Sequence, residues 1–430
     1  MKGWMRIGTM CALAGMLLAV VSCGPDESEP EVREQVTIRL AAGHVGQQLQ
    51  HLQVIAEDFN QQHPYIRISL IDFPDVPQEI MARYDQYLLS EDPGLDVLMV
   101  DVIWPGDLAE HLLDLNPYFT EEEITAHFPA TIENNTVGDR LVAIPWFLDS
   151  GLLYYRSDLL ERYGREVPET WQELEQTARY IQQQERSAGN DDFWGFIWQA
   201  GPGEGLTCMA LEIIYSHGGG TIVNPEGQLD VDNPRAAQGL QRARDWIGDI
   251  TPADALNFTG AEGPRTMWET GNILFMRNWP YAFNLGNRPE SPIAGRFDIA
   301  RLPAEPGYQS AATLGGWQLG VSRYSRNPAE AAEVVRHITS YETQLRRALE
   351  QGDFPTIRAL YQDERLIASD NPMFSRLADV LDYTVARPST VTAPNYNDFS
   401  RDFYNLVHQA LAGGISVPDA LSAVELPESR

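Results

Sequence analysis

Lysine is nearly absent from the sequence: after Lys2, every basic side chain is an arginine. A Walker A loop, a pyridoxal-phosphate Schiff base and a lysine nucleophile each need a lysine amine, so these three chemistries are excluded. Positive charge as a whole is scarce, with 31 basic against 61 acidic residues and a net charge of −30. Because binding to phosphates requires basic patches, we expect no nucleic acid among the partners.

Motifs for catalysis and metal binding are also missing. The sequence contains no HExxH, CxxC or GxSxG pattern, and its eight histidines include no pair at metal-ligand spacing. We therefore expect no bound metal, no cofactor and no enzyme activity.

Only one long hydrophobic run is present, and it lies at the N-terminus. Lys2 and Arg6 precede an apolar segment at residues 7–21, which is too short for a membrane-spanning helix but typical of a signal peptide. Cys23 follows the small residues at the end of this run, as in a bacterial lipobox, where the cysteine is acylated and becomes the new N-terminus. Residues 1–22 are thus predicted to be a lipoprotein signal peptide and Cys23 the lipidation site. The alternative is a plain secretory signal with an incidental cysteine.

The mature chain is predicted to be exported to the periplasm or cell surface and anchored to the membrane through Cys23. Residues 23–35 are rich in proline and glutamate, have no apolar period and are predicted to be a flexible tether. Removal of residues 1–22, which carry two basic and no acidic side chains, would take the net charge from −30 to −32. Cys208 would then be the one remaining free thiol, so no internal disulfide can form and the core must supply the stability.

The rest of the chain has the composition of a globular protein, with 43% hydrophobic, 10% aromatic and 21% charged residues. At roughly 150 residues per domain, this length predicts two or three domains. Apolar periodicity predicts strands at 36–42, 66–71, 96–100, 141–145, 151–155 and 273–276. It predicts helices at 47–62, 77–89, 171–184, 206–217, 234–247, 328–340, 344–349 and 399–412. Thr170 and Glu173 are spaced as a capping box at the start of one of them.

The alternation of strands and helices over residues 36–100 predicts an α/β fold with a parallel sheet covered by helices. In such sheets, ligands bind at the carboxyl ends of the strands. The loop after Ala42 and the segment from Asp101 to Trp104 are therefore predicted to border a binding site.

Aromatic residues stand beside isolated polar groups at several of these loop edges. The pairs are Asp101 with Trp104, Phe147 with Asp149, Trp279 with Tyr281, Gly316 with Trp317, and Arg387 with Pro388. A pyranose has apolar C–H faces that stack on aromatic rings, and a rim of hydroxyls that carboxylates and guanidinium groups bind in pairs. The pattern therefore favours a sugar-binding site.

The motifs that contain these residues resemble the substrate-binding proteins of ABC sugar importers, namely extracellular solute-binding protein family 1. Within it, the chain resembles the trehalose/maltose-binding lipoproteins, from about residue 36 to the C-terminus. The resemblance rests on several motifs in the same order: DVIW at 101–104, IP at 144–145, DSGLLYYRSDLL at 149–160, PETW at 168–171, FWGF at 193–196, RNWPY at 277–281, GGW at 315–317, RP at 387–388 and YNDFS at 396–400.

This resemblance implies a periplasmic-binding-protein fold of type II, in which two α/β lobes with parallel sheets are joined by a multi-strand hinge and close on a sugar. Lobe 1 is expected at 36–147 and 302–357, and lobe 2 at 148–301 and 358–430. The disaccharide contacts of the family fall on Asp101, Asp149, Trp279, Tyr281, Gly316, Trp317 and Arg387. Relatives carry a tyrosine where this chain has Phe147, and a glutamate in the loop that here offers Gln48. With Trp104, these make ten predicted ligand-binding residues.

The expected function is that of a monomeric substrate-binding lipoprotein that captures a disaccharide or glucoside, such as trehalose, sucrose, glucosylglycerol or maltose. It would deliver the sugar to the permease and ATPase subunits of an ABC importer. Two alternatives stay open at this point. One is a secreted glycosidase with Asp101 and Asp149 as its acid and base; the other is a sugar-sensing receptor.

Overall fold

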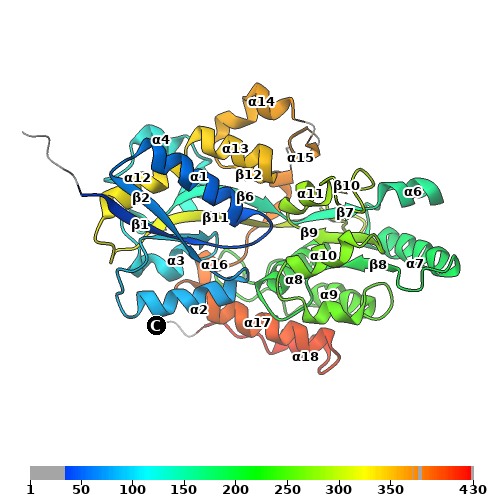
Figure 1. Ribbon diagram of the computed structural model, residues 1–430. Helices are drawn as coiled ribbons and strands as arrows, with labels where there is room; N and C mark the ends of the chain where they lie inside the picture. The colour runs from blue at the N-terminus through cyan, green and yellow to red at the C-terminus, as the bar shows by residue number, and fades with distance from the viewer. Residues whose placement is uncertain (1–33, 370, 376–379, 428–430) are drawn as a thin grey trace, which may run out of the picture. The chain divides into compact units, whose positions relative to one another are not determined.

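A computed structural model of the chain describes residues 34–369, 371–375 and 380–427 (Figure 1). The predicted signal peptide, Cys23 and nearly all of the predicted tether lie outside these residues. Residues 35–430 group as one compact unit. No helix in the described ranges is both long and apolar enough to cross a bilayer.

Two sheets organise the chain. The larger contains β1 (Val36–Ala42), β2 (Ile66–Asp72), β3 (Val97–Asp101), β6 (Ile144–Ser150), β11 (Ala312–Val321), β12 (Phe354–Pro355) and β13 (Thr384–Val385). The smaller contains β7 (Leu152–Tyr155), β8 (Trp194–Ile197), β9 (Ile273–Asn278) and β10 (Asp298–Ala300), while β4 (Thr136–Val137) and β5 (Arg140–Leu141) pair separately.

Helices fill the segments between the strands. They are α1 (Gln48–Gln62), α2 (Pro77–Leu88), α3 (Pro105–Leu108), α4 (Glu121–Thr125), α5 (Pro129–Asn134), α6 (Ser157–Tyr163), α7 (Trp171–Ser187), α8 (Glu204–Ser216), α9 (Pro234–Trp246), α10 (Glu262–Glu269), α11 (Tyr281–Gly286), α12 (Pro328–Ile338), α13 (Tyr341–Gln351), α14 (Glu364–Ile367), α15 (Pro372–Ser375), α16 (Ser389–Thr392), α17 (Tyr396–Leu411) and α18 (Val417–Ser422). Short 3₁₀ turns lie at Ala109–His111, Ala253–Asn257, Arg358–Gln362 and Val380–Tyr383.

Most of the predicted strands and helices are present, with ends shifted by a few residues. The run at 141–145 instead divides between β5, which ends at Leu141, and β6, which begins at Ile144 and continues to Ser150. The capping box of α7 is confirmed, since the Thr170 hydroxyl accepts from the Glu173 N–H at 3.2 Å and the Glu173 carboxylate accepts from the Thr170 N–H at 3.0 Å. The ten-residue strand β11 is not predicted by the hydrophobic pattern, because Gly315 and Gly316 interrupt its apolar run.

The larger sheet has the order β12-β6-β11-β3-β1-β2, with β13 paired to β11. The strands β1, β2 and β3 are parallel, as predicted, and Ala42 of β1 lies in register with Asp72 of β2. However, β11 runs antiparallel to both β3 and β6, so the expectation of a parallel sheet is wrong for this half. The reason is topological: β6 leads out of this sheet towards the smaller one and β11 leads back into it, so the two run in opposite directions.

The smaller sheet, of order β10-β7-β9-β8, is also mixed. Only β8 and β9 are parallel, while β7 is antiparallel to both β9 and β10. Gly151 alone separates β6 from β7, and the segment between β10 and β11 returns the chain to the larger sheet. The lobe boundaries expected from the sequence stay a prediction; β6 keeps its pairing in the larger sheet as far as Ser150.

Separate hydrophobic clusters stabilise the two sheets. One face of the larger sheet packs against α1 and α12, and the opposite face packs against α2 and α3 (Figure 1). Alternate residues of β1 divide between them, with Ile38 and Leu40 facing α1 and Ala41 facing α2. The smaller sheet lies in the largest cluster, together with α7, α8, α9 and α17. Each sheet is therefore covered by its own helices, which leaves its strand ends free to form a site.

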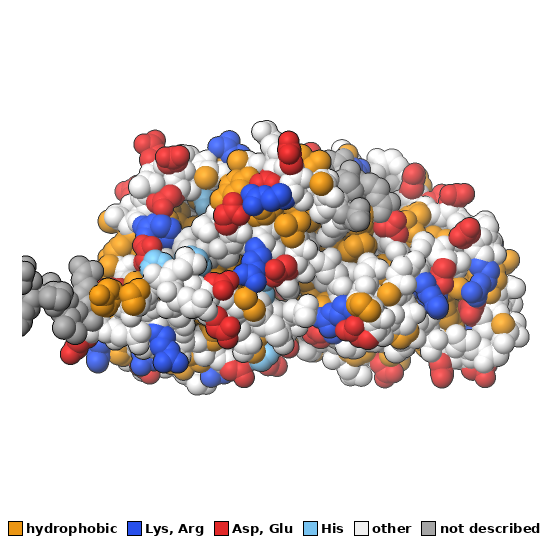
Figure 2. Space-filling model, turned by 45° about the horizontal axis from the view of Figure 1, so that its top comes forward, with side chains coloured by type: hydrophobic (Ala, Val, Ile, Leu, Met, Phe, Trp, Pro, Cys, Tyr) orange, Lys and Arg blue, Asp and Glu red, His pale blue; other side chains and the backbone are white. Residues whose placement is uncertain are grey.

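The surface carries arginines beside acidic side chains on the face shown in Figure 2. Arg346, for example, pairs with both Asp58 and Glu350, and Arg365 pairs with Glu342. Because the chain has 61 acidic against 31 basic residues, negative charge is in large excess even where one arginine serves two acids. This imbalance predicts a strong effect of salt on stability.

Candidate functional site

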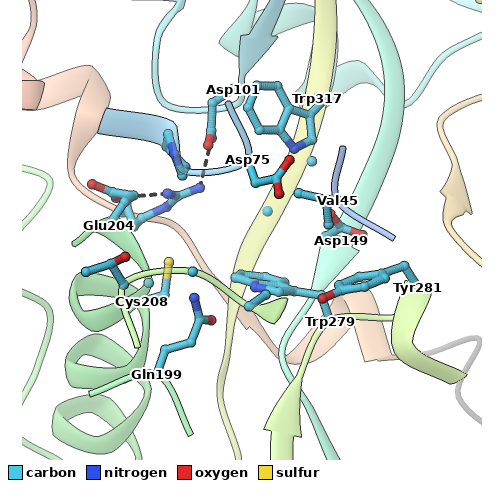
Figure 3. Close-up of a pocket in the computed structure, with 18 residues that line it drawn as sticks. Val45, Asp75, Asp101, Asp149, Gln199, Glu204, Cys208, Trp279, Tyr281 and Trp317 are labelled. Carbon is cyan, nitrogen blue, oxygen red and sulfur yellow. Dashed lines mark hydrogen bonds and ion pairs between the residues drawn. The ribbon is translucent and has the colours of Figure 1, made fainter. Parts of the chain in front are cut away.

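A pocket of about 640 Å³, open solvent included, lies where elements of the two sheets meet (Figure 3). Seven of the ten predicted ligand-binding residues line it: Asp101, Asp149, Trp279, Tyr281, Gly316, Trp317 and Arg387. These residues come from five separate segments of the chain, which the fold brings together in one pocket.

Strand register explains how three segments of the larger sheet meet in the pocket. Trp317 of β11 is the neighbour of Asp101 on β3, and Gly315 is the neighbour of Asp149 on β6. Directly paired residues of neighbouring strands project to the same face of a sheet. The β6–β11 register shifts just after Trp317, a bulge of the kind that redirects a side chain beside a site.

Gly316 is required by this packing. Its φ is +132°, a conformation that side chains rarely adopt, and an added Cβ would overlap the Phe147 carbonyl oxygen. The glycine therefore brings the backbone of β11 close to β6 at the floor of the pocket.

The indole of Trp279 is held as a platform. Trp279 is half-buried and follows β9, where its backbone N–H donates to the Asn278 side-chain oxygen at 2.8 Å and its backbone carbonyl accepts from the Tyr154 hydroxyl at 2.7 Å. The Arg277 guanidinium lies 4.1 Å from the ring centroid, and a Cβ on Gly315 would lie 2.9 Å from the ring. With its position fixed before any ligand arrives, the ring can stack on a sugar at a low entropic cost.

Below this platform lies a fully buried ion pair. Both Arg277 and Glu212 have no exposed side-chain surface, and Nε of the arginine donates to Oε2 of the glutamate at 2.9 Å. The Thr313 N–H donates to Oε1 at 2.9 Å. The pair therefore ties the β9 end to β11, close to both places where the chain passes between the sheets.

Arg387 lies between two carboxylates at the inner end of the pocket. It donates through Nη2 to Asp101 at 3.1 Å and through Nη1 to Glu204 at 2.9 Å (Figure 3). Glu204 also accepts from the hydroxyls of Tyr396 and Ser400. Burial raises the pKa of Asp101 to about 6, against the opposing effect of Arg387. Nε of Arg387 has no partner among the described residues and remains available as a donor.

Asp149 has an oxygen free for a ligand. Its Oδ1 is buried and, within the described part of the chain, accepts no hydrogen bond. Burial, and then the nearby Asp353 carboxylate, raises its pKa well above the usual value, while Arg347 acts in the opposite direction. A sugar hydroxyl that donated to Oδ1 would remove the cost of this unsatisfied acceptor.

Three predicted residues do not line the pocket. Trp104 is fully buried, donates its indole N–H to Asn397 at 2.9 Å and packs edge-to-face on Trp317, so it supports a pocket residue from behind. Phe147 lies in the core under the Arg347 guanidinium, 3.7 Å from its ring centroid.

Gln48 also points away from the pocket. It is the first residue of α1, is buried, and donates from its side-chain amide to the Met99 sulfur at 3.0 Å. The loop before it contributes Val45 to the lining instead. The side chain of Gln48 is therefore absent from the pocket lining, and its contact with a ligand stays a prediction.

Several lining residues were not predicted: Val45, Asp75, Pro77, Gln199, Glu204, Gly205, Cys208, Thr259, Gly260, Ala261 and Gly315. Asp75 had a partial signal, since it lies in the loop after the predicted strand at 66–71, although four residues beyond the strand end and not directly after it as Asp101 does. Glu204 had none, because an acidic residue at the start of a helix is common whether or not it binds anything. The single thiol, Cys208, is buried and its pKa is raised to about 12 by burial, so it lines the pocket as a neutral group.

Known proteins resemble this chain over most of its length. Residues 46–345 match the sequence pattern of the bacterial extracellular solute-binding proteins. A protein of Deinococcus radiodurans described as a probable ABC transporter-binding protein is 46% identical over 359 residues, which cover 83% of this chain and 85% of that one.

Two solved structures share the fold. The maltose-bound MalE3 of T. maritima is 38% identical, with a TM-score of 0.84, and the match covers 90% of this chain and 97% of that one. The GacH receptor of Streptomyces glaucescens, solved unliganded and with acarbose, is 21% identical with a TM-score of 0.78 over 90% and 95% of the two chains. The two-lobed binding-protein fold expected from the sequence is therefore confirmed.

Proposed function

This chain belongs to the bacterial extracellular solute-binding proteins, and we propose that it captures a neutral disaccharide or glucoside for an ABC importer. The candidate ligands are maltose, trehalose, sucrose and glucosylglycerol. Maltose gains support from the relative in T. maritima, which was solved with that sugar bound. Delivery goes to the membrane permease of the importer and its ATPase, and the protein acts as a monomer.

One observation carries this proposal: a single pocket contains the indoles of Trp279 and Trp317 together with the Asp101–Arg387 pair and the free oxygen of Asp149. The rings suit the apolar faces of a pyranose, and the charged groups suit its hydroxyls. An anionic ligand is disfavoured, because the carboxylates that line the pocket outnumber the one arginine, and the two indoles suit the apolar faces of a neutral sugar.

Capture works by closure of the two lobes. The lining residues come from elements of both sheets. A sugar can therefore contact residues of both lobes only in the closed state. A ligand that binds the closed state better shifts the population towards it. No bond is broken in this cycle. The glycosidase alternative gains no support, because Asp101 is held by Arg387 rather than free to exchange a proton with a substrate.

Titration calorimetry of the mature protein tests the proposal with the four candidate sugars. We expect at least one to bind at micromolar concentration, which corresponds to about −8 kcal/mol, and no glucose to be released during a long incubation. Absence of binding by all four, or glucose release at enzymatic rates, would contradict the proposal.

Export and anchoring through Cys23 belong to the same proposal. A Cys23→Ser variant, expressed with the full leader, should leave the membrane fraction and appear as soluble protein. If the variant stays in the membrane fraction with unchanged mobility, the anchor lies elsewhere.

A further inference from the structure

The loop after β2 supplies a carboxylate to the mouth of the pocket. β1 and β2 are parallel and end in register, so the loops that follow them lie side by side, and the Phe73 N–H donates to the Ala42 carbonyl at 2.9 Å. The next acidic residue, Asp75, lines the pocket, as does Val45 of the loop after β1. In Figure 3 the Asp75 carboxylate lies across the pocket from Trp279.

One hydrogen bond holds the Asp75 side chain in place. One oxygen, Oδ1, accepts from the His44 N–H at 2.9 Å, and in the described ranges this is the only hydrogen-bond donor to the side chain. No ion pair with arginine engages it there. By contrast, two acids at the inner end of the pocket, Asp101 and Glu204, share the guanidinium of Arg387.

The surroundings of Asp75 place it at the outer end of the pocket. Asp75 is half-buried, whereas its neighbours Asp72 and His44 are exposed. Arg387, at the inner end, is only 6% exposed. A sugar ring that contacts Arg387 therefore occupies the interior, and a second ring linked to it extends towards Asp75.

The electrostatics make this carboxylate receptive to a donor. Burial raises the pKa of Asp75, the hydrogen bond from His44 and the electrostatic effect of His44 lower it, and the nearby Glu262 and Asp72 raise it further. Each of these raising effects reflects a cost of holding the negative charge there. Hydroxyl groups that donate to the second oxygen, Oδ2, would reduce that cost, while a carboxylate on a ligand would increase it.

We propose that Asp75 recognises the second ring of a neutral disaccharide, and thereby distinguishes disaccharides from one-ring glucosides and from anionic sugars. This inference rests on the proposed sugar-binding function. Asp75 thus takes the role that was expected of a glutamate in the loop after β1. Gln48, the residue of that loop, is buried against Met99 and does not fill this role.

Asp75→Asn is the informative variant, because asparagine keeps an oxygen for the His44 N–H but loses the charge. Glu79→Gln is the matched control: Glu79 is exposed near the start of α2, four residues away, and lies outside the pocket lining. Thermal unfolding without sugar should show both variants within about 2 °C of the unmodified protein. The probes are maltose, trehalose, methyl α-glucoside and maltobionate, with the weak ones measured by competition against a labelled disaccharide.

We expect Asp75→Asn to lower the affinity for the tighter-binding disaccharide about tenfold, or about 1.4 kcal/mol. The affinity for methyl α-glucoside should change less than twofold. The preference for maltose over maltobionate should narrow in the same variant, and Glu79→Gln should change none of these affinities. If Asp75→Asn lowers the affinities for the disaccharide and the one-ring glucoside equally, or leaves the affinity for the disaccharide unchanged, the inference is overturned while the sugar-binding function stands. If the unmodified protein binds neither disaccharide, both fail.

Discussion

Replacement of Gly151 by alanine tests whether the buried ion pair joins the two sheets. Gly151 is the single residue between β6 and β7, and an added Cβ would overlap Oε1 of Glu212 and lie 2.6 Å from Nη2 of Arg277. Neither partner can move into solvent, because both side chains are fully buried. The substitution therefore forces the carboxylate and the guanidinium apart.

The expected loss of stability follows from the hydrogen bonds that this displacement breaks. Glu212 accepts from Arg277 Nε and from the Thr313 N–H, each at 2.9 Å, and both bonds share the carboxylate that the new methyl group would displace. Loss of one partner of a buried ion pair costs about 3 to 5 kcal/mol. Since displacement leaves both charges near each other, we expect Gly151→Ala to lower the free energy of unfolding by about 3 kcal/mol, at the lower end of that range.

Denaturant unfolding followed by tryptophan fluorescence measures this loss. Gly189→Ala is the control: an added Cβ there has no atom within 4 Å, but Gly189, unlike Gly151, has a positive φ of +99°. Its cost is the backbone strain alone, about 1 to 2 kcal/mol. Gly151→Ala should also weaken sugar binding, because Arg277 lies against the Trp279 ring. A stability loss for Gly151→Ala no larger than that for Gly189→Ala would refute the reasoning.

Three other predictions concern the ligand and the solvent. Trp279→Ala should abolish sugar binding in calorimetry and leave the fold intact, because stacking anchors in a desolvated pocket contribute several kcal/mol. If the affinity falls less than about threefold, on the order of 0.7 kcal/mol, the ring belongs to the core and not to the site. Because the pKa of Asp101 is raised from 3.8 to about 6, its protonated form stabilises the free protein fully below pH 3.8, and this contribution is lost as the pH rises through 6. Sugar binding requires the ionised form of Asp101, which holds Arg387, so the affinity for sugar should fall up to tenfold per pH unit below about pH 6. Equal affinities at pH 5 and pH 7 would contradict this prediction. With a net charge of −30, the melting temperature should rise between about 0.1 M and 2 M sodium chloride as repulsion is screened, and a fall would contradict this.

The first three strands and their helices were predictable because local pattern alone encodes them. Residues 36–42 and 66–71 are β-branched runs bounded by turn residues, and a strand–helix–strand order of this kind has few topologies open to it. Asp101 was identified by the same rule, as a polar residue at the carboxyl end of a buried strand. The two-lobed architecture, and the assignment of the other six lining residues to one site, then followed from motif order in the resemblance and not from periodicity.

The remaining features depend on contacts between distant parts of the chain. Arg387 meets Asp101 across 286 positions and Glu204 across 183, and no local pattern encodes such a pairing. β11 escaped prediction because its glycines serve close strand packing rather than a turn. Gln48 illustrates the opposite error: a polar side chain at the right loop turns into the core, where the Met99 sulfur accepts its hydrogen bond.

A crystal structure of the mature protein with its tightest-binding disaccharide tests the central claim most directly. The account predicts one sugar ring stacked on Trp279, with hydroxyls within hydrogen-bond distance of Asp101, Asp149 and Arg387, and the second ring directed towards Asp75. A sugar bound outside this pocket, or one bound within it that leaves the Trp279 ring uncovered, would contradict the account.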